Sequence, residues 1–350
     1  MTGPTRGNRA AWAGLALVLV LVVALTGTFL IQAIRAQRRA RVPTAATQLD
    51  RALDLGAVLD RPHILFRSSA PGPTYGRVAA VPLTDPGGKR SVSTMSCDRI
   101  AATTDGAICL AADRGAITRY RAELLTGRLA AGRLIPITGI PSRARLSPDG
   151  SWAATTTFIS GQGYGTIGFS TETKIVERSD GRSFGNLEKT FSTVIGGRVV
   201  TASDLNIWGV TFAPGPRPNL FYATVATGGS TWLARGDLRG RTLTAVREDA
   251  ECPSLSPDGR TLVYKKRAGS RVRWRYHVLD LATGLERPLS ETRSVDDQVE
   301  WLDNEHVLYS LARPGSAQAD VWMADVRSRA RPVRFMRDAS SPAVVTGPAS

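Results

Sequence analysis

Hydrophobic residues follow two different patterns along the chain. Residues 11–31 form one stretch of 21 residues without a charge, dense in Leu, Val and Ala. As a helix, at about 1.5 Å per residue, this stretch is about 30 Å long, which matches the hydrocarbon thickness of a bilayer. From His63 onward, short apolar runs alternate instead with turn residues, which is typical of an all-β domain. The patterns therefore predict a membrane helix followed by a domain of strands.

Basic residues bracket the long apolar stretch. Arg6 and Arg9 precede it, and four arginines follow it between residues 35 and 41. A cleavable signal peptide has an apolar core of about 7–15 residues and a small-x-small cleavage site, whereas this core is longer and no clean site follows it. We therefore predict an uncleaved transmembrane helix over residues 11–31. A buried helix of a soluble domain is the alternative.

A turn motif punctuates the β region. Leu146-Ser147-Pro148-Asp149-Gly150 returns as Leu255-Ser256-Pro257-Asp258-Gly259, and Thr103-Thr104-Asp105-Gly106 is a weaker copy. Pro in the second and Gly in the fourth position of a four-residue turn suit type I geometry, so each motif is predicted to be a hairpin tip. The units around these tips read as four antiparallel strands in about 40–55 residues, which is typical of a propeller blade.

The repeated units number six. They begin near His63, Cys97, Arg145, Trp208, Cys252 and Val299, and the third carries the largest excess of residues. Residues 341–345 resemble the opening strand of a blade, and we expect them to complete the first blade and so close the ring. The predicted fold class is all-β: a six-bladed β-propeller of four-stranded antiparallel blades, preceded by one N-terminal transmembrane helix.

These patterns divide the chain into five segments. They are a short N-terminal tail (1–10), the transmembrane helix (11–31), a juxtamembrane stalk (32–61), the propeller (62–345) and a C-terminal tail (346–350). Within the stalk, apolar residues between Leu49 and Leu59 could stripe a short helix. We interpret the stalk as a spacer; a partner-binding helix is the alternative.

The repeated phrases resemble a known family. The Ser-Pro-Asp-Gly hairpins and the turn at residues 278–284 are similar to TolB-like, WD-type propeller repeats, and the order of the phrases resembles membrane-anchored TolB-like proteins of actinobacteria. The resemblance covers about residues 62–345 and implies work in an envelope complex, but a likeness of fold transfers no partner. Residues 215–218 and 303–305 depart from the Pro-Asp-Gly tip. The further stretches that carry the resemblance are Phe169–Thr171, Asn206–Phe212, Glu251–Leu255 and Asp296–Trp301.

Composition narrows the range of functions. The chain has 45 Lys plus Arg against 30 Asp plus Glu, a formal net charge of +15. With 42% hydrophobic and 21% charged residues, a wholly disordered chain is excluded. Only 3 Cys and 3 His leave little material for a metal site or a redox enzyme, and the histidines are scattered over three blades. We expect no cofactor and no metal ion.

Two cysteines, Cys97 and Cys109, lie twelve residues apart around the Thr-Asp-Gly tip. Outside the cytoplasm such a pair usually forms a disulfide. If the tip pairs Thr103 with Gly106, however, Cys97 does not face its partner, and a bulge or register shift is required. Two buried, reduced thiols are the alternative. The pair and the family resemblance together favour a single-pass protein of the cell membrane with an extracytoplasmic propeller, although the flanking arginines point the other way under the positive-inside rule.

Acidic and amide side chains precede three of the predicted inner strands. In a propeller such connections gather around one mouth of the central channel, where they could bind a cation, a sugar or a peptide terminus. The alternative is that they cap turns and hydrogen-bond neighbouring blades. The candidate binding residues are Asp204, Asn206, Glu251, Asp296, Asp297 and Gln298.

A second candidate surface is the most basic stretch of the chain. Alternation places Arg271, Arg273 and Arg275 on one face of a strand, with Trp274 and Tyr276 on the other. A polyanion such as a phospholipid surface or a cell-wall phosphate polymer could bind there. The alternative is a solvated face over a buried Trp-Tyr stripe. Nucleic acid is disfavoured by the outside location and by the lack of interleaved aromatic residues on the basic face.

The sequence favours a non-enzymatic, membrane-tethered, extracytoplasmic propeller that binds a protein or another component of the cell envelope. It contains no Gly-x-Ser-x-Gly nucleophile elbow. One alternative is a propeller hydrolase or lyase acting on envelope glycans, for which Glu251 and Asp297 are the candidate carboxylate pair. The other is a ligand-sensing accessory protein.

Overall fold

The computed structural model describes residues 53–347, except residues 116, 160–169, 216–218 and 270–272, together with Trp12, Leu15, Ala16, Leu19, Val22 and Thr28. Contacts divide the chain into two units, Met1–Gln48 with Pro71–Pro73, and Leu49–Ala70 with Thr74–Ser350. Most of the predicted transmembrane segment lies outside the described residues, and the six described positions within it are helical. Within the described part of the chain, no helix is long and apolar enough to cross a membrane.

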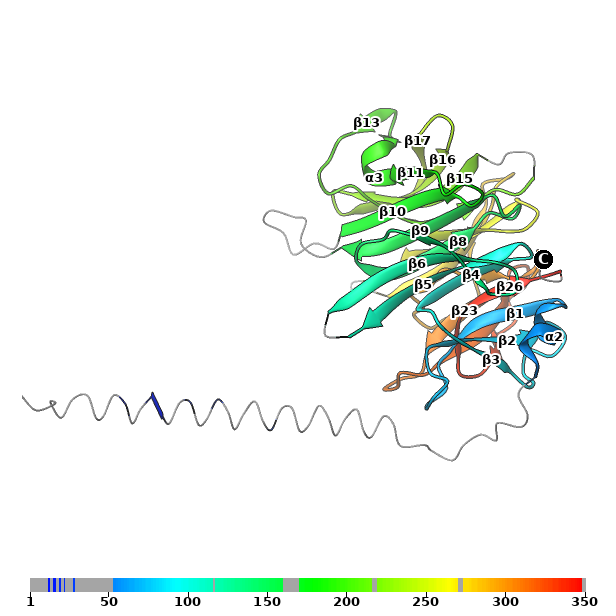
Figure 1. The fold of residues 1–350 in the computed structure, drawn as a ribbon. Helices are drawn as coiled ribbons and strands as arrows, with labels where there is room; N and C mark the ends of the chain where they lie inside the picture. Colours follow the sequence, from blue (N-terminus) through cyan, green and yellow to red (C-terminus); the bar gives the residue numbers. More distant parts are fainter. Residues whose placement is uncertain are drawn as a thin grey trace, which may run out of the picture. The chain divides into compact units, whose positions relative to one another are not determined.

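Six sheets follow one another along the second unit as the blades of a propeller, each with its first strand innermost except in blade 1 (Figure 1). Blade 1 holds β26 (Ala339–Val345), β1 (His63–Ser68), β2 (Arg77–Pro82) and β3 (Ser91–Ser96). Blade 2 holds β4 (Arg99–Thr103), β5 (Gly106–Arg114), β6 (Thr118–Leu125) and β7 (Ala131–Ile135). Blade 3 holds β8 (Ile140–Leu146), β9 (Trp152–Ile159), β10 (Ser170–Glu177) and β11 (Ser183–Asn186).

The other three blades repeat this order, and the predicted six-bladed, all-β fold is confirmed. Blade 4 contains β14 (Asn206–Phe212), β15 (Leu220–Thr227), β16 (Ser230–Asp237) and β17 (Thr242–Glu248). Blade 5 contains β18 (Glu251–Leu255), β19 (Thr261–Arg267), β20 (Trp274–Asp280) and β21 (Glu286–Pro288). Blade 6 contains β22 (Glu300–Trp301), β23 (His306–Ala312), β24 (Ala319–Asp325) and β25 (Val333–Met336).

The Ser-Pro-Asp-Gly motifs form the hairpin tips that the sequence predicts. In the first copy, the Gly150 N–H donates to the Ser147 carbonyl oxygen at 2.9 Å, and the Ser147 hydroxyl donates to the Asp149 carboxylate at 2.5 Å. The second copy, Ser256–Gly259, has the same two bonds. Both glycines have a φ of +70°, a conformation that costs glycine little and other residues more. The motif therefore fixes the turn from the first strand of a blade to the second.

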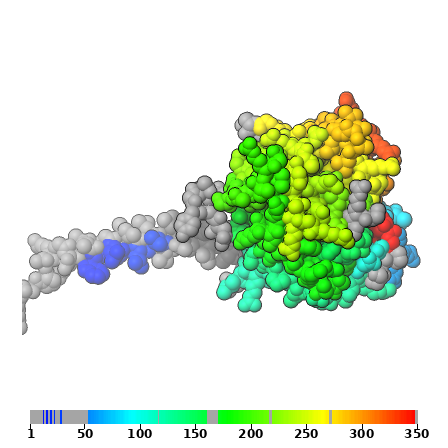
Figure 2. Space-filling view, turned by 90° about the horizontal axis from the view of Figure 1, so that it is seen from above, coloured from blue at the N-terminus to red at the C-terminus, as the bar shows by residue number. Residues whose placement is uncertain are grey.

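The C-terminal strand closes the ring. β26 pairs antiparallel with β1, with Val345 opposite His63 and Ala343 opposite Leu65. Figure 1 shows β26 in red beside β1 in blue, and in Figure 2 red residues lie next to blue and cyan ones. The prediction that residues 341–345 complete the first blade is confirmed. This pairing covers the edge of β1 and joins the two ends of the propeller in one sheet.

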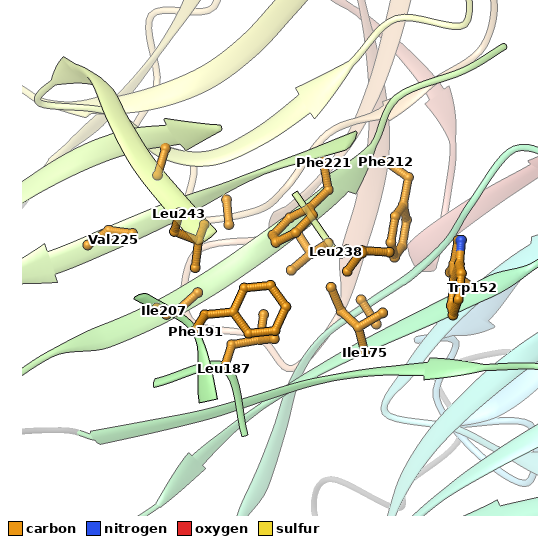
Figure 3. Close-up of a cluster of buried hydrophobic side chains, with 14 residues drawn as sticks. Trp152, Ile175, Leu187, Phe191, Ile207, Phe212, Phe221, Val225, Leu238 and Leu243 are labelled. Atoms are coloured by element: carbon orange, nitrogen blue, oxygen red, sulfur yellow. The ribbon is translucent and has the colours of Figure 1, made fainter. Parts of the chain in front are cut away.

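Blade 4 departs from the predicted four strands. The excess length of the third unit forms three further elements, α3 (Leu187–Thr190), β12 (Ser192–Ile195) and β13 (Arg198–Val200). Because β12 pairs in parallel with β17, this sheet has six strands. Apolar packing explains the attachment: Leu187 and Phe191 are buried between blades 3 and 4, and the Phe191 and Phe221 ring centres are 6.1 Å apart (Figure 3). Burying one such side chain contributes about 1.5–3 kcal/mol.

Cys97 and Cys109 form a disulfide, as predicted. The register obstacle does not arise, because Cys97 lies before the ladder: β4 begins at Arg99, and Ile100 faces Cys109. The bond therefore joins the connection that follows blade 1 to the second strand of blade 2. The third cysteine, Cys252, is buried and unpaired.

The short helix expected within the stalk packs on the propeller. α2 (Leu55–Leu59) begins after Asp54, whose carboxylate accepts a hydrogen bond from the Ala57 N–H at 3.2 Å. Val58 and Leu59 are buried in the apolar core between blades 1 and 2. This packing places α2 within the body of the propeller.

Candidate functional site

An ion pair bridges the centre of the ring. Arg145 on β8 of blade 3 and Glu300 on β22 of blade 6 meet in a hydrogen-bonded ion pair. The guanidinium also donates to the Val299 carbonyl oxygen at 3.0 Å, and the carboxylate accepts from the Val344 N–H at 3.2 Å. Burial raises the pKa of Glu300 in spite of the positive charge of Arg145. Because blades 3 and 6 are not neighbours, this pair, which we call the central plug, crosses the channel.

The central plug separates two hollows in the channel, and Arg145 and Glu300 line both. We call the face that carries the hairpin tips the tip face, and the opposite face, where the chain leads into each inner strand, the loop face. The hollow toward the tip face measures about 270 Å³ and is lined by all six blades, with several apolar side chains among its walls. The hollow toward the loop face measures about 30 Å³ and is lined largely by charged and amide side chains.

One of the candidate residues, Gln298, ties blades together at the loop face. The Gln298 amide donates to the carbonyl oxygens of Gly209 and Val210 at 3.2 Å and of Pro253 at 2.7 Å. These acceptors belong to blades 4 and 5, whereas Gln298 leads into blade 6.

The Asp297 side chain is only 10% exposed and serves the backbone of blade 6. One oxygen accepts from the Gln298 N–H and the other from the Ser310 N–H, each at 3.0 Å. Arg99 Nη1 lies 3.8 Å from Asp297 Oδ1. Both carboxylate oxygens therefore have backbone partners before any cation is considered.

Asp296 is exposed at the mouth, with 65% of its side chain accessible. It pairs with Lys265 and lies 3.6 Å from Arg143 Nη2. Burial opposes ionisation of Asp296, but the charge and hydrogen bond of Lys265 outweigh it and lower the pKa. This carboxylate is thus ionised and open to solvent.

Glu251 is buried, and its nearest cation is Arg267, with Nε 3.6 Å from Oε1. Among the described residues, Oε1 has no hydrogen-bond partner. Burial raises the pKa of Glu251 against the lowering effect of the Lys265 and Arg267 charges. The structure brings Glu251 to the same mouth as Asp296, since Lys265 interacts with both.

Asp204 and Asn206 serve the junction of blades 3 and 4 instead. The Asp204 carboxylate accepts from the Thr227 hydroxyl at 2.5 Å and the Gly228 N–H at 2.7 Å, which caps the β15–β16 turn. The Asn206 amide oxygen accepts from the Thr171 N–H of β10 at 2.7 Å. Their hydrogen bonds go to these neighbours and, within the described residues, not to the other four candidates.

Sequence reasoning missed a group of arginines on the loop face. A hollow of about 250 Å³ lies where blades 1, 2 and 3 meet, and Arg67, Arg99, Arg114 and Asp98 line it. We call this hollow the arginine cup. The sequence contains a signal for these arginines. Arg99 is the first residue of the inner strand of blade 2, and Arg143 and Arg145 alternate along the inner strand of blade 3. Arginines from blades 2 and 3 therefore lie at the same mouth of the channel as the predicted acidic residues.

The basic stretch on β20 matches in part the alternative of a solvated face over a buried Trp-Tyr stripe. Trp274 and Tyr276 are buried, with 8% and 2% of their surface exposed, so the Trp-Tyr stripe is present. Arg273 is exposed, and Arg275 donates to the Thr292 carbonyl oxygen. Arg271 lies outside the described residues.

Comparison with known proteins finds likeness at the level of the fold. No family model and no curated protein matches the sequence. TolB from Acinetobacter baumannii is 15% identical, with a TM-score of 0.53 over 81% of this chain and 66% of that chain, so this chain spans just under two thirds of its length. A putative TolB from Agrobacterium tumefaciens is 10% identical, with a TM-score of 0.50 over 82% and 94% of the two chains. The nidogen/laminin complex also matches, at 13% identity and a TM-score of 0.50 over 81% and 98%.

The two TolB structures have the same fold that the propeller repeats in the sequence predict. Identities of 10–15% speak for the fold alone, and a fold does not carry its partners or activity with it. Within the described residues, no group of three or more His, Cys, Asp and Glu side chains is placed to hold a metal ion. The ring of six blades, the Ser-Pro-Asp-Gly tips and the C-terminal closure together show that the described residues between 62 and 345 form a six-bladed β-propeller, which is similar in fold to TolB.

Proposed function

We propose that this protein is a non-enzymatic propeller, tethered to the membrane with the propeller on the extracytoplasmic side, which binds a protein or another component of the cell envelope through its loop face. One contrast carries the proposal: the charges of the central plug are paired with each other across the channel, whereas the loop face presents accessible charge. The Asp296 and Arg114 side chains there are 65% and 67% exposed. Charged groups held on the connections of a stable scaffold are suited to recognising a partner.

Two features support the tether and the compartment. The uncharged stretch at residues 11–31 is long enough for a bilayer. The Cys97–Cys109 disulfide is typical of proteins outside the cytoplasm. Protease added to intact spheroplasts should remove the propeller, while a carbonate wash should leave the anchor in the membrane. Full protection of the propeller would contradict this orientation.

The bonding of the candidate carboxylate pair supports a binding function over glycan cleavage. A general acid and a second carboxylate must both face the substrate. Asp297 instead accepts backbone hydrogen bonds on both oxygens, and Glu251 is buried beside Arg267. The resemblance of the sequence repeats to TolB-like proteins is the reason for proposing an envelope component as the ligand, and the shared fold alone does not identify it.

Recovery of crosslinked partners from intact membranes tests the loop face. We compare Asp296→Asn with Glu305→Gln on the tip face, because both carboxylates are exposed, at 65% and 48%. Asp296 pairs with the buried Lys265 and Glu305 with the exposed Arg327, so a melting curve of each variant accompanies the recovery. The proposal predicts that Asp296→Asn lowers partner recovery at least about fivefold, since a charge at the contact is lost, while Glu305→Gln leaves it unchanged. Equal recovery by the two folded variants would contradict the loop face as the binding surface.

A further inference from the structure

The arginine cup gathers cations from different blades into one open hollow. Arg67 comes from the end of β1 in blade 1, whereas Arg99 and Arg114 come from the start of β4 and the end of β5 in blade 2. Asp98 is the one carboxylate among the residues that line the hollow. The cup therefore carries a surplus of positive charge, and its volume of about 250 Å³ leaves room for a ligand.

Arg67 is a cation without an anionic partner. Among the described residues no ion pair to it is found; its guanidinium instead lies over the Tyr75 ring, 4.8 Å from the ring centre. A guanidinium stacked on an aromatic ring keeps its hydrogen-bond donors at the edge. This arrangement orients the group without neutralising its charge.

Arg99 is only weakly compensated. Its Nη1 lies 3.8 Å from Asp297 Oδ1, which is beyond hydrogen-bond distance, and both Asp297 oxygens already accept backbone N–H groups. Burial and the positive charge of Arg143 lower the pKa of Arg99, and Arg67 adds to this effect. A second negative charge at this position would therefore be favourable.

Arg114 and Asp98 form the rim of the cup. Arg114 Nη2 lies 3.2 Å from Asp98 Oδ1, and the other Asp98 oxygen accepts from the Ala112 N–H at 2.8 Å. The Arg114 side chain is 67% exposed, so its pair with Asp98 is screened by water and costs little to rearrange. Arg114 can thus turn toward a ligand while Asp98 stays bonded to the backbone.

We propose that the arginine cup binds a phosphate group, carried by an envelope molecule or free in solution. The inference rests on the proposed function in taking the loop face as the binding surface. Guanidinium groups bind oxyanions through paired N–H donors. A carboxylate presents two oxygens in one plane, which a single guanidinium satisfies. A phosphate presents oxygens in several directions, so that arginines from blades 1 and 2 can contact it together.

Calorimetric titration of the full-length protein in a nonionic detergent tests the cup, with inorganic phosphate and acetate as probes at constant ionic strength. We expect saturable phosphate binding at least about tenfold tighter than acetate binding. Arg67→Gln should weaken phosphate binding about tenfold, and its melting temperature should fall only slightly, because the exposed contact with the Tyr75 ring is lost but no ion pair is. The matched control is Arg329→Gln, an exposed arginine on the tip face, which should bind phosphate like the unaltered protein.

Three results would overturn the proposal: no saturable phosphate binding, acetate binding of equal strength, or unchanged phosphate affinity in both Arg67→Gln and Arg99→Gln. Two further probes distinguish the source of the phosphate. Tighter binding of glycerophosphoglycerol than of sn-glycerol 3-phosphate indicates a lipid headgroup, and the reverse order indicates a free or terminal phosphate. If Asp296→Asn loses partners while phosphate fails to bind, the result supports the loop face as the binding surface and contradicts only the phosphate site.

Discussion

The central plug and the arginine cup are two charged clusters of the same propeller with opposite bonding. In the plug, the Arg145 and Glu300 side chains are 16% and 18% exposed and bond to each other and to the backbone of other blades. In the cup, Arg67 has no ion pair among the described residues, and Arg114 is mostly in solvent. Both clusters contain inner-strand arginines, so residue type does not separate them.

What separates them is whether each charge has its partners inside the protein. A buried charge with a full set of partners holds the fold, since removal of one partner leaves the other unsatisfied. A charge without partners contributes little to folding and is free to bind a ligand. The comparison therefore predicts large stability effects and no binding effect in the plug, and the reverse in the cup.

The largest effect is expected for Glu300→Gln. It leaves the Arg145 charge unbalanced in a mostly buried position, and breaking such a pair costs about 3–5 kcal/mol. Denaturant unfolding measures the loss, with Arg114→Gln as the control at below about 1 kcal/mol because its pair is exposed. If Glu300→Gln lowers the free energy of unfolding by less than about 1 kcal/mol, the structural role of the plug is contradicted.

Removal of the disulfide should have the next largest effect. The bond closes a loop of 12 residues, and replacing Cys97 and Cys109 by Ser should cost about 2–3 kcal/mol. Because Cys97 directly precedes Asp98 and Arg99, the same change should also weaken phosphate binding in the cup. Thermal unfolding of the unaltered protein with and without reductant measures how much the disulfide contributes to stability. Insensitivity to reductant would show that the bond adds nothing to the fold.

Glu188 on α3 provides a third case, a half-buried carboxylate with hydrogen bonds but no ion pair among the described residues. It accepts from the Thr171 hydroxyl at 2.8 Å and the Thr173 N–H at 3.1 Å, and burial raises its pKa from 4.5 to about 7. As pH falls through about 7, the folded protein takes up a proton that the unfolded chain takes up only near 4.5. The contribution of this residue to stability therefore increases on acidification from pH 8 to pH 5, by about 2–3 kcal/mol.

The Glu188 effect is read as a difference between two pH profiles of the unfolding free energy. The unaltered protein should gain stability relative to Glu188→Gln between pH 8 and pH 5, because the amide does not titrate. Parallel profiles would show that the Glu188 carboxylate is ionised in the folded protein over this range.

The smallest stability effects should separate two neighbouring aspartates. Asp297→Asn places an amide group against a backbone N–H, which costs about 1–2 kcal/mol, and should leave partner recovery unchanged. Asp296→Asn should also cost about 1–2 kcal/mol, since it removes the charge opposite Lys265, whose side chain is only 3% exposed, but it should reduce recovery. Melting curves and crosslinked recovery on the same two proteins give the result. A binding loss confined to Asp297→Asn would place the site deeper in the channel.

Local patterns were enough to predict most of the fold. The Ser-Pro-Asp-Gly turns contain their own hydrogen bonds, so short motifs identify the hairpins wherever they recur. The closing strand was recognisable because it repeats a blade's first strand. The extra strands β12 and β13 were not, since their place beside β17 depends on packing of Leu187 and Phe191 between two blades.

The candidate site was harder to predict, because bonding partners come from distant blades. Gln298 and Asp297 look like open polar groups in sequence, yet carbonyl and N–H groups from blades 4, 5 and 6 surround them. The arginine cup joins residues from three blades, and no local pattern shows that Arg67 lacks an anionic partner in the described part of the chain. Sequence reasoning placed acidic and amide residues at one mouth of the channel but did not place the arginines there.

Photocrosslinking in intact cells tests most directly whether the loop face binds the partner. A photoreactive amino acid is placed at Ile117 on the loop face or at Leu285 on the tip face, because both side chains are apolar and exposed, at 77% and 72%. Neither substitution removes a charge or a buried contact, so both proteins should fold alike. The account predicts a crosslinked adduct at position 117 and none at position 285. An adduct at position 285 alone, or equal adducts at both positions, would contradict it.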